Sequence, residues 1–138
     1  MDLRQASRQR QVLRAIIEEH QRLALTLLHP RELIKGTLYQ LRTRCGKETC
    51  RCARTKKDRH VSTVLSWSEE GRTRLRSVAT SDEHRLRQLA EQYRRFRETR
   101  ASLVQLHRQI LEAINCLEAA LRVPHPAPRR RSSEKKRM

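Results

Sequence analysis

The sequence has few aromatic residues, few glycines and no long apolar run. Its 138 residues include one Trp, two Tyr, one Phe and three Gly. A core built from so few large side chains must be modest, and chains of this kind commonly gain stability from a metal or from oligomerisation. The same scarcity argues against a protein that binds single strands by stacking bases on aromatic rings.

Targeting signals are also missing. The longest apolar stretch, Leu23 to Leu28, is far too short to span a bilayer. Charged residues occur throughout the first twenty positions, which excludes a secretory signal there. We therefore expect a cytoplasmic protein, associated with the nucleoid if it binds DNA. A reducing compartment favours cysteines as metal ligands over disulfides.

Catalytic patterns are lacking too. The chain has three aspartates, Asp2, Asp58 and Asp82, and no carboxylate cluster that could hold a catalytic Mg²⁺. No P-loop, GxSxG or HExxH pattern occurs. These absences predict a protein that is not an enzyme.

Positive charge, in contrast, is abundant. Lys and Arg number 32 against 15 Asp and Glu, for a formal net charge of +17. Such an excess predicts a phosphate-rich partner, because polyanion binding is driven by neutralised phosphates and released counterions. An anionic membrane surface is the second possibility.

Hydrophobic periodicity predicts an α+β fold. Residues 3–28 form a helix capped by Asp2 and ended by Pro30, with a further helical turn from Pro30 to Lys35. Alternating patterns predict antiparallel strands at 36–45, 61–67 and 72–78, the last two joined by a four-residue loop, Ser68 to Gly71. We divide the chain into a helical segment (1–35), a zinc-stapled β module (36–79), a long heptad helix (80–122) and a disordered basic tail (123–138).

The long helix carries a heptad seam. Thr80 and Glu83 fit a capping box at its start, and a helix over 81–122 would be about 60 Å long. Residues spaced alternately by three and four form the seam: Leu86, Leu89, Tyr93, Phe96, Arg100, Leu103, His107, Ile110, Ile114, Leu117 and Leu121. Such a stripe predicts a coiled-coil homo-oligomer, unless the N-terminal helix covers it. A protein-interaction adaptor is the corresponding alternative function.

Three cysteines and a histidine form a possible metal site. Cys45, Cys50, Cys52 and His60 follow the spacing C-x4-C-x-C-x7-H, and Cys3His is a common ligand set for structural Zn²⁺. Gly46 permits a turn that brings Cys50 back toward Cys45, and Cys50 and Cys52 point to one side if the backbone is extended. Buried thiols or a redox pair are the alternatives.

The fourth ligand is less constrained by the spacing than the three thiols. His60 is favoured, with His84, His29 or a solvent ligand as alternatives. Cys116, in the long helix, is expected to be a small buried residue.

Basic residues surround this cluster. Residues 42–59 carry eight positive and two negative charges, a net +6, and three arginines alternate along the last strand. If the strands pair, these side chains could form one basic surface beside the zinc loop, and a two-stranded ribbon fits a DNA major groove. Duplex DNA is favoured, RNA is possible, and an RNA- or ribosome-associated basic protein is a further alternative function. The predicted contacts are Arg42, Arg44, Lys47, Arg51, Arg54, Lys56, Lys57, Arg59, Arg72, Arg74 and Arg76.

A likeness to a known family rests on the segment Arg44-Cys45-Gly46-Lys47-x-x-Cys50-Arg51-Cys52-Ala53, with Lys35-Gly36-Thr37-Leu38 before it and His60 and the Tyr93–Arg97 helix after it. In these residues the sequence resembles a family of small prokaryotic proteins of unestablished function. Their genes often lie near transposases and other mobile DNA. The likeness covers roughly residues 33–120. It implies a metal-binding accessory to DNA transactions, such as the partner of a recombinase or transposase, and supplies no catalytic residue. The family's Gly-Pro and aromatic run after the histidine are replaced here by Val61 to Leu65.

Overall fold

The computed structural model describes residues 1–29 and 31–129, and it confirms the α+β class. Two helices, α1 (Leu3–Thr26) and α2 (Thr80–Leu121), enclose in sequence three strands, β1 (Thr37–Thr43), β2 (His60–Glu69) and β3 (Arg72–Ser77). Two short 3-10 turns, η1 (Arg51–Ala53) and η2 (Lys56–Asp58), lie between β1 and β2. Pro30 and residues 130–138, which make up most of the expected disordered basic tail, lie outside the described residues.

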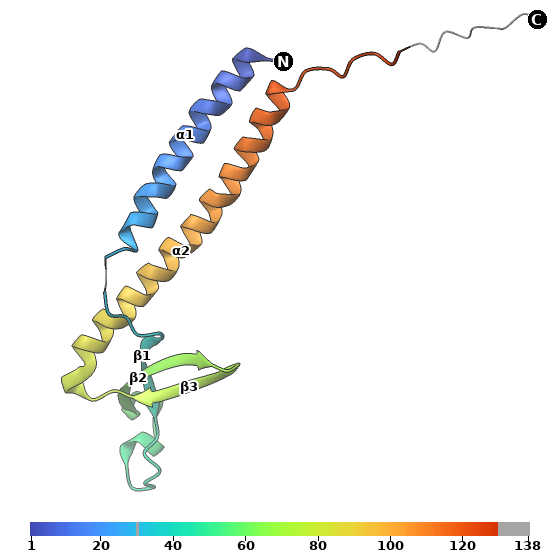
Figure 1. The fold of residues 1–138 in the computed structure, drawn as a ribbon. Coiled ribbons are helices and arrows are strands. Elements are labelled where there is room, and N and C mark those ends of the chain that lie inside the picture. The colour runs from blue at the N-terminus through green and yellow to red at the C-terminus, as the bar shows by residue number, and fades with distance from the viewer. Residues whose placement is uncertain (30, 130–138) are drawn as a thin grey trace, which may run out of the picture.

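The two helices pack side by side as an antiparallel hairpin, which we call the stem (Figure 1). The backbone N–H of Asp2 donates to the carbonyl of Ala120 at 2.9 Å, so the start of α1 lies beside the end of α2. Asp2 caps α1 as predicted, since its Oδ1 accepts from the N–H groups of Arg4 and Gln5. The cap of α2 is Ala79, which makes no side-chain hydrogen bond, so the predicted Thr80 capping box is wrong.

A heptad row on each helix lines the stem interior, but on α2 it differs in part from the predicted seam. Arg100 and His107 are exposed, and the covered row runs through Leu106 and Ala113 instead. Alanines let the helices approach closely, and the chosen row avoids desolvating the two polar side chains. The buried or half-buried rows are Ala6, Gln9, Leu13, Ile16, His20, Leu23 and Leu27 on α1, and Thr99, Leu103, Leu106, Ile110, Ala113, Leu117 and Ala120 on α2.

The strands form one antiparallel sheet in the order β1-β2-β3. β1 pairs with β2 along its whole length, from Thr37 opposite Ser66 to Thr43 opposite His60. β3 pairs only with the half of β2 that begins at Val64. The β2–β3 connection has two residues, Glu70 and Gly71, both with positive φ, instead of the predicted four.

The sheet is attached to α2 through the segment before β1. The N–H of Ile34 donates to the carbonyl of Leu89 at 3.2 Å. Residues 31–34 form no helix, so the further turn predicted there is wrong. Gly36 has φ +148°, and a Cβ at this position would lie 2.8 Å from both Leu65 Cδ1 and the carbonyl oxygen of Ser66. A glycine is needed for this close approach of chain to sheet.

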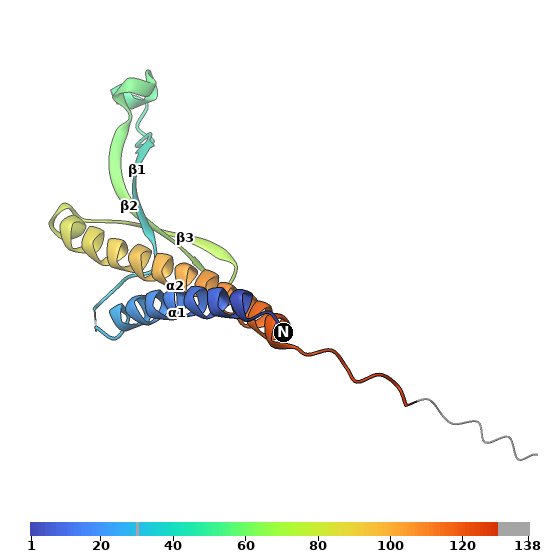
Figure 2. The same cartoon turned by 90° about the horizontal axis from the view of Figure 1, so that it is seen from above.

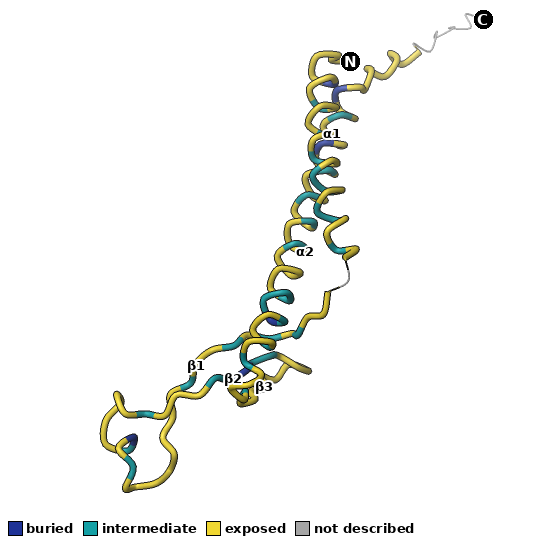
Figure 3. Tube along the Cα trace, turned by 90° about the vertical axis from the view of Figure 1, so that its left-hand side faces the viewer, coloured by how far each residue is buried: buried dark blue, intermediate teal, exposed yellow. Residues whose placement is uncertain are grey.

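β1, β2 and the connecting residues 44–59 project from the stem as an arm (Figure 2). The pairing of β3 with β2 ends at Val64 of β2. The outer part of the arm, beyond that residue, is therefore a two-stranded ribbon of β1 and β2. Figure 3 shows how few positions are buried along both the stem and the arm. None of the helices in the described part of the chain is long and apolar enough to cross a membrane.

Candidate metal centre and basic surface

The three cysteines and His60 meet at the tip of the arm. Antiparallel pairing sets Thr43 opposite His60, so Cys45, two residues beyond Thr43, lies beside the start of β2. Gly46 has φ +84°, the left-handed conformation that the predicted turn requires. We call residues 44–59, which close on themselves here, the metal loop.

Cys50 and Cys52 reach the cluster by a route that the sequence did not suggest. The N–H of Cys50 donates to the carbonyl of Lys47 at 3.2 Å, and Cys52 lies inside the 3-10 turn η1. The expectation of extended backbone through Cys52 is therefore wrong, because a tight turn follows Cys50. This turn buries Cys52 to 1% exposure, while Cys45 and His60 stay exposed.

The distances between the four side chains suit one metal ion. Cys52 Sγ is 3.5 Å from Cys45 Sγ, Cys50 Sγ is 3.3 Å from His60 Nε2, and all four ligand atoms lie within 4.8 Å of one another. Tetrahedral Zn²⁺ with bonds of ~2.3 Å to sulfur sets its sulfurs about 3.8 Å apart. The cluster fits a tetrahedral ion after small adjustments, and its four protein donors are the set of a structural site.

The surroundings shift the titration of these groups. The pKa of Cys50 falls to about 6, because the backbone N–H of Cys52 and then the side chains of Cys52 and His60 hydrogen-bond to its sulfur. The N–H of Cys45 donates to Cys52 at 3.4 Å and by itself lowers the pKa of Cys52, but burial and the neighbouring thiols outweigh this effect and raise it. Hydrogen bonding to Cys50 raises the pKa of His60.

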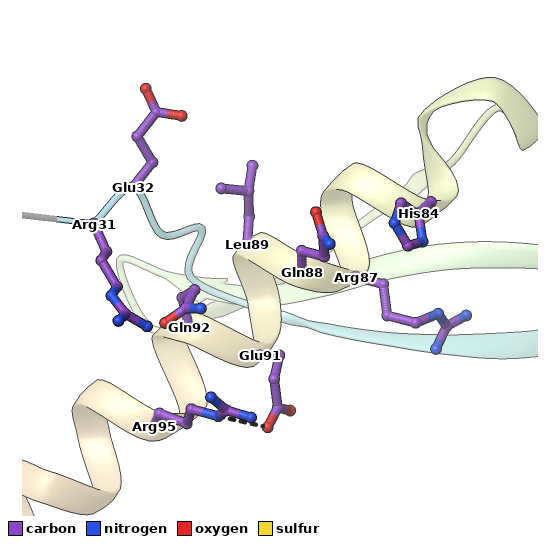
Figure 4. A pocket seen from close by; sticks show the side chains of 9 residues that line it. All are labelled: Arg31, Glu32, His84, Arg87, Gln88, Leu89, Glu91, Gln92 and Arg95. Atoms are coloured by element: carbon purple, nitrogen blue, oxygen red, sulfur yellow. Dashed lines mark hydrogen bonds and ion pairs between the residues drawn. The ribbon is translucent and has the colours of Figure 1, made fainter.

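The other candidate ligands lie elsewhere. His84 is on the first turns of α2 and lines an open hollow beside residues 31–32 (Figure 4), and His29 lines a groove near the end of α1. Cys116 is exposed on α2, so its expected burial is wrong. Among the described residues, His60 is the histidine that joins the three thiols.

The predicted phosphate contacts fall into two groups. Eight of them belong to the metal loop or to the strand end that leads into it, and seven of these eight are exposed: Arg42, Arg44, Lys47, Arg51, Arg54, Lys56 and Lys57. Arg59 is the half-buried eighth, and its Nε has no hydrogen-bond partner among the described residues. Sequence reasoning counted Arg59 as one more surface charge and missed this enclosed donor.

The arginines of β3 form the second group and lie apart from the metal loop. Register sets Arg76 opposite Leu65 and Arg72 opposite Glu69, toward the end of β2 that lies away from His60. Along a strand the five steps from His60 to Leu65 span about 17 Å, and the nine steps to Glu69 span about 30 Å. β3 therefore does not continue the basic surface of the loop.

Ion pairing distinguishes the metal loop from the part of α2 that lies nearest the sheet. No cation between residues 42 and 59 forms an ion pair within the described residues. On α2, Arg94 pairs with Glu91 and Glu98, and Arg87 pairs with Glu83. Arg95 also pairs with Glu91, at 3.3 Å, in the hollow of Figure 4. Residues 42–59 thus gather eight cations without an ion pair, while other arginines without one, such as Arg4, Arg8 and Arg14, are spread along α1.

Comparison with protein families gives a match over residues 5–88 to the family described as a domain of unknown function (DUF6788). The match spans more than half of the chain, and the protein belongs to this family. It includes α1, the sheet and the metal loop, and it ends inside α2, whereas the resemblance noted from the sequence began near residue 33. No curated protein and no solved structure matches the chain.

Proposed function

We propose that the protein is a non-enzymatic, zinc-binding accessory of DNA transactions that grips the phosphate backbone of duplex DNA with its metal loop. Zinc, held by Cys45, Cys50, Cys52 and His60, keeps the loop folded. The reaction it serves is of the recombinase or transposase kind. The observation that carries the proposal is that eight cations, none of them in an ion pair within the described residues, lie in or next to the loop that holds the Cys3His cluster.

Charge supports the choice of partner. Unpaired, exposed cations keep their full field, whereas an arginine held between two glutamates contributes little. The loop segment 42–59 has a net charge of +6. Neutralising several phosphates there would release counterions and give binding that weakens steeply with salt.

Shape supports duplex DNA in particular. The outer arm is a two-stranded ribbon, of which residues 40–43 and 60–63 pair with each other without β3. A ribbon of this width enters the major groove of B-form DNA, while the deep, narrow major groove of A-form RNA does not admit it. Most contacts of the loop would be to phosphates, with little sequence preference.

Titration of zinc-loaded protein against a fluorescent DNA duplex, at two salt concentrations, tests the proposal. We compare Arg44→Gln/Lys47→Gln/Lys56→Gln in the loop with Arg87→Gln/Arg94→Gln/Arg95→Gln on α2, which removes the same net charge from paired arginines. The loop variant should bind at least about 10-fold more weakly and lower the salt slope by about 3, near 0.9 per lost contact. The α2 variant should stay within about 3-fold of the parent protein.

Equal losses in both variants would show that binding follows overall charge and would contradict a role for the loop. Binding that is absent at low salt would reject nucleic acid as the partner. A third titration uses an RNA duplex of the same length. Tighter binding to RNA than to DNA would show that the partner is RNA.

A further inference from the structure

One flank of the stem carries a group of large apolar side chains that no described residue covers. Six large apolar side chains on the two helices, away from the row that joins them, are between 39% and 63% exposed. They are Leu3 and Ile17 on α1 and Val104, Leu111, Ile114 and Leu121 on α2. We call this surface the open flank.

Heptad geometry sets these residues on the same side of the stem. Counted from the covered rows, position e holds Leu3, Arg10 and Ile17 on α1 and His107, Ile114 and Leu121 on α2, with Val104 and Leu111 in the neighbouring position b of α2. In an antiparallel pair of helices, e positions of one helix adjoin e positions of the other. The opposite flank is polar apart from Val12: Gln5, Glu19, Thr26, Ser102, Gln109 and Cys116.

The open flank continues a surface that the chain already covers at its other end. Near the sheet, α2 presents Ala90, which is 9% exposed, and Tyr93 to a groove shared with Leu38 and Trp67. The last α2 residue along this groove is Ala101, and Val104 is one turn further on. Beyond that point no described residue takes the place of the sheet.

Local charge allows a second copy of the chain to bind there. Residues 2–17 and 104–121, which build this end of the stem, carry five basic and three acidic side chains, a net +2 of the total +17. Residues 3–16 hold four arginines and no acid, and residues 109–121 hold two glutamates and no base. The basic α1 of one copy is complementary in charge to the acidic end of α2 of another.

Packing within the stem also favours a second copy of the chain as the partner of the open flank. In the described chain, the buried residues of the two helices are all alanines: Ala6, Ala90, Ala113 and Ala120. A pair of helices has a single contact layer, so its larger seam residues stay half-exposed. Four-helix bundles enclose such residues by adding two more helices.

We propose that the open flank binds the open flank of a second copy, so that two stems form a four-helix bundle carrying two metal loops. The surface from Val104 to Leu121 is about 26 Å long, and two helices make it about 20 Å wide. This area is of the order of the ~800 Å² per partner that a specific interface buries. Self-association of this kind is independent of the proposed DNA binding.

Sedimentation of the zinc-loaded full chain at micromolar concentration tests the assignment. The parent protein should sediment as a dimer. Leu111→Glu/Ile114→Glu should raise the dimer dissociation constant at least about 100-fold, because two carboxylates would have to be desolvated at the interface. Gln105→Glu/Gln109→Glu adds the same charge outside the open flank and should remain a dimer.

A milder pair of substitutions guards against misfolding. Leu111→Ala/Ile114→Ala keeps strong helix formers at both sites and should weaken the dimer about 10-fold with an unchanged helical circular dichroism signal. A monomeric parent protein, or a Leu111→Glu/Ile114→Glu variant that dimerises as the parent does, would overturn the proposal.

Discussion

Cys52 and Arg59 show how single residues define the site. Cys52 is as well covered as a core alanine, although no apolar core exists at the tip of the arm. Zn²⁺ bound by three thiolates and one imidazole carries a net charge of about −1, from +2 and three −1. Arg59 precedes His60 in the chain and is half-buried, and its enclosed Nε has no partner among the described residues, which costs free energy unless the positive charge compensates that of a bound metal centre.

Metal affinity should fall in acid, with a steeper slope below about pH 6. Zinc needs thiolates, so protons compete with it at each sulfur. In the metal-free protein the pKa of Cys50 is about 6, so above that pH this thiol is already ionised and binding releases no proton from it. Below that pH Cys50 must also be deprotonated, and because a ligating imidazole must be neutral, the raised pKa of His60 makes a second proton compete with zinc in acid.

Competition with a chromophoric chelator between pH 5 and pH 8 measures this slope. His60→Ala removes a ligand and one of the hydrogen bonds that lower the pKa of Cys50, so it should weaken zinc binding and move the change of slope to higher pH. A slope that is constant across the range would contradict the low pKa of Cys50.

At the scale of elements, α2 offers two overlapping heptad rows, and α1 covers one of them. The rows share Leu103, Ile110 and Leu117, and they differ where one contains Leu106 and the other contains His107. Of the other predicted seam residues, Leu89 and Tyr93 are half-buried, while Phe96 and Ile114 are 41% and 44% exposed. Ile114 and Leu121, which belong to the row that α1 does not cover, form part of the proposed interface with a second copy.

Substitutions at adjacent positions distinguish the two rows. Leu106→Ala should lower the free energy of unfolding by about 1–2 kcal/mol, less than at a fully buried site because Leu106 is half-buried. His107→Ala should not lower it, since His107 is exposed and alanine favours helix. Urea unfolding followed by circular dichroism measures both. A larger loss at His107 would show that α1 covers the other row.

For the molecule as a whole, the stem and the arm meet at few points. The hydrogen bond from Ile34 to Leu89 and the approach of Gly36 to Leu65 lie where β1 begins, at the opposite end of the arm from the metal loop. Each part has its own source of stability, helix packing in the stem and the candidate metal centre in the arm. Local unfolding of one part therefore need not unfold the other.

Removing the metal should unfold the metal loop and spare the stem. With excess chelator, we expect the amide protons of residues 44–60 to lose protection from exchange, while α1 and the distal half of α2 keep theirs. Hydrogen exchange read by mass spectrometry measures both, and Cys116→Ser is the control because its exposed thiol lies outside the cluster. A loop that stays protected without metal would contradict a stapling role.

The sequence alone determined those features that depend on local order. Periods of 3.6 and 2 residues predicted the helices and strands within a few positions, and a short polar side chain before the first apolar repeat predicted the Asp2 cap. The spacing of Cys45, Cys50, Cys52 and His60, with Gly46 between, indicated the cluster, because all four belong to a single chain reversal. Such signals involve residues that are close together along the chain. Backbone dihedral angles largely fix the geometry of such residues.

Tertiary structure decided the features for which the sequence offers near-equal alternatives. Two heptad rows on α2 have similar apolar content, and packing against α1 selected between them. The two-residue turn at Glu70 and Gly71 fixed the register of β3 and so placed its arginines opposite the half of β2 that lies away from His60. Which cations pair with glutamates also depends on distances between side chains in the folded molecule. Contacts between separate elements set these outcomes, and a local pattern does not contain them.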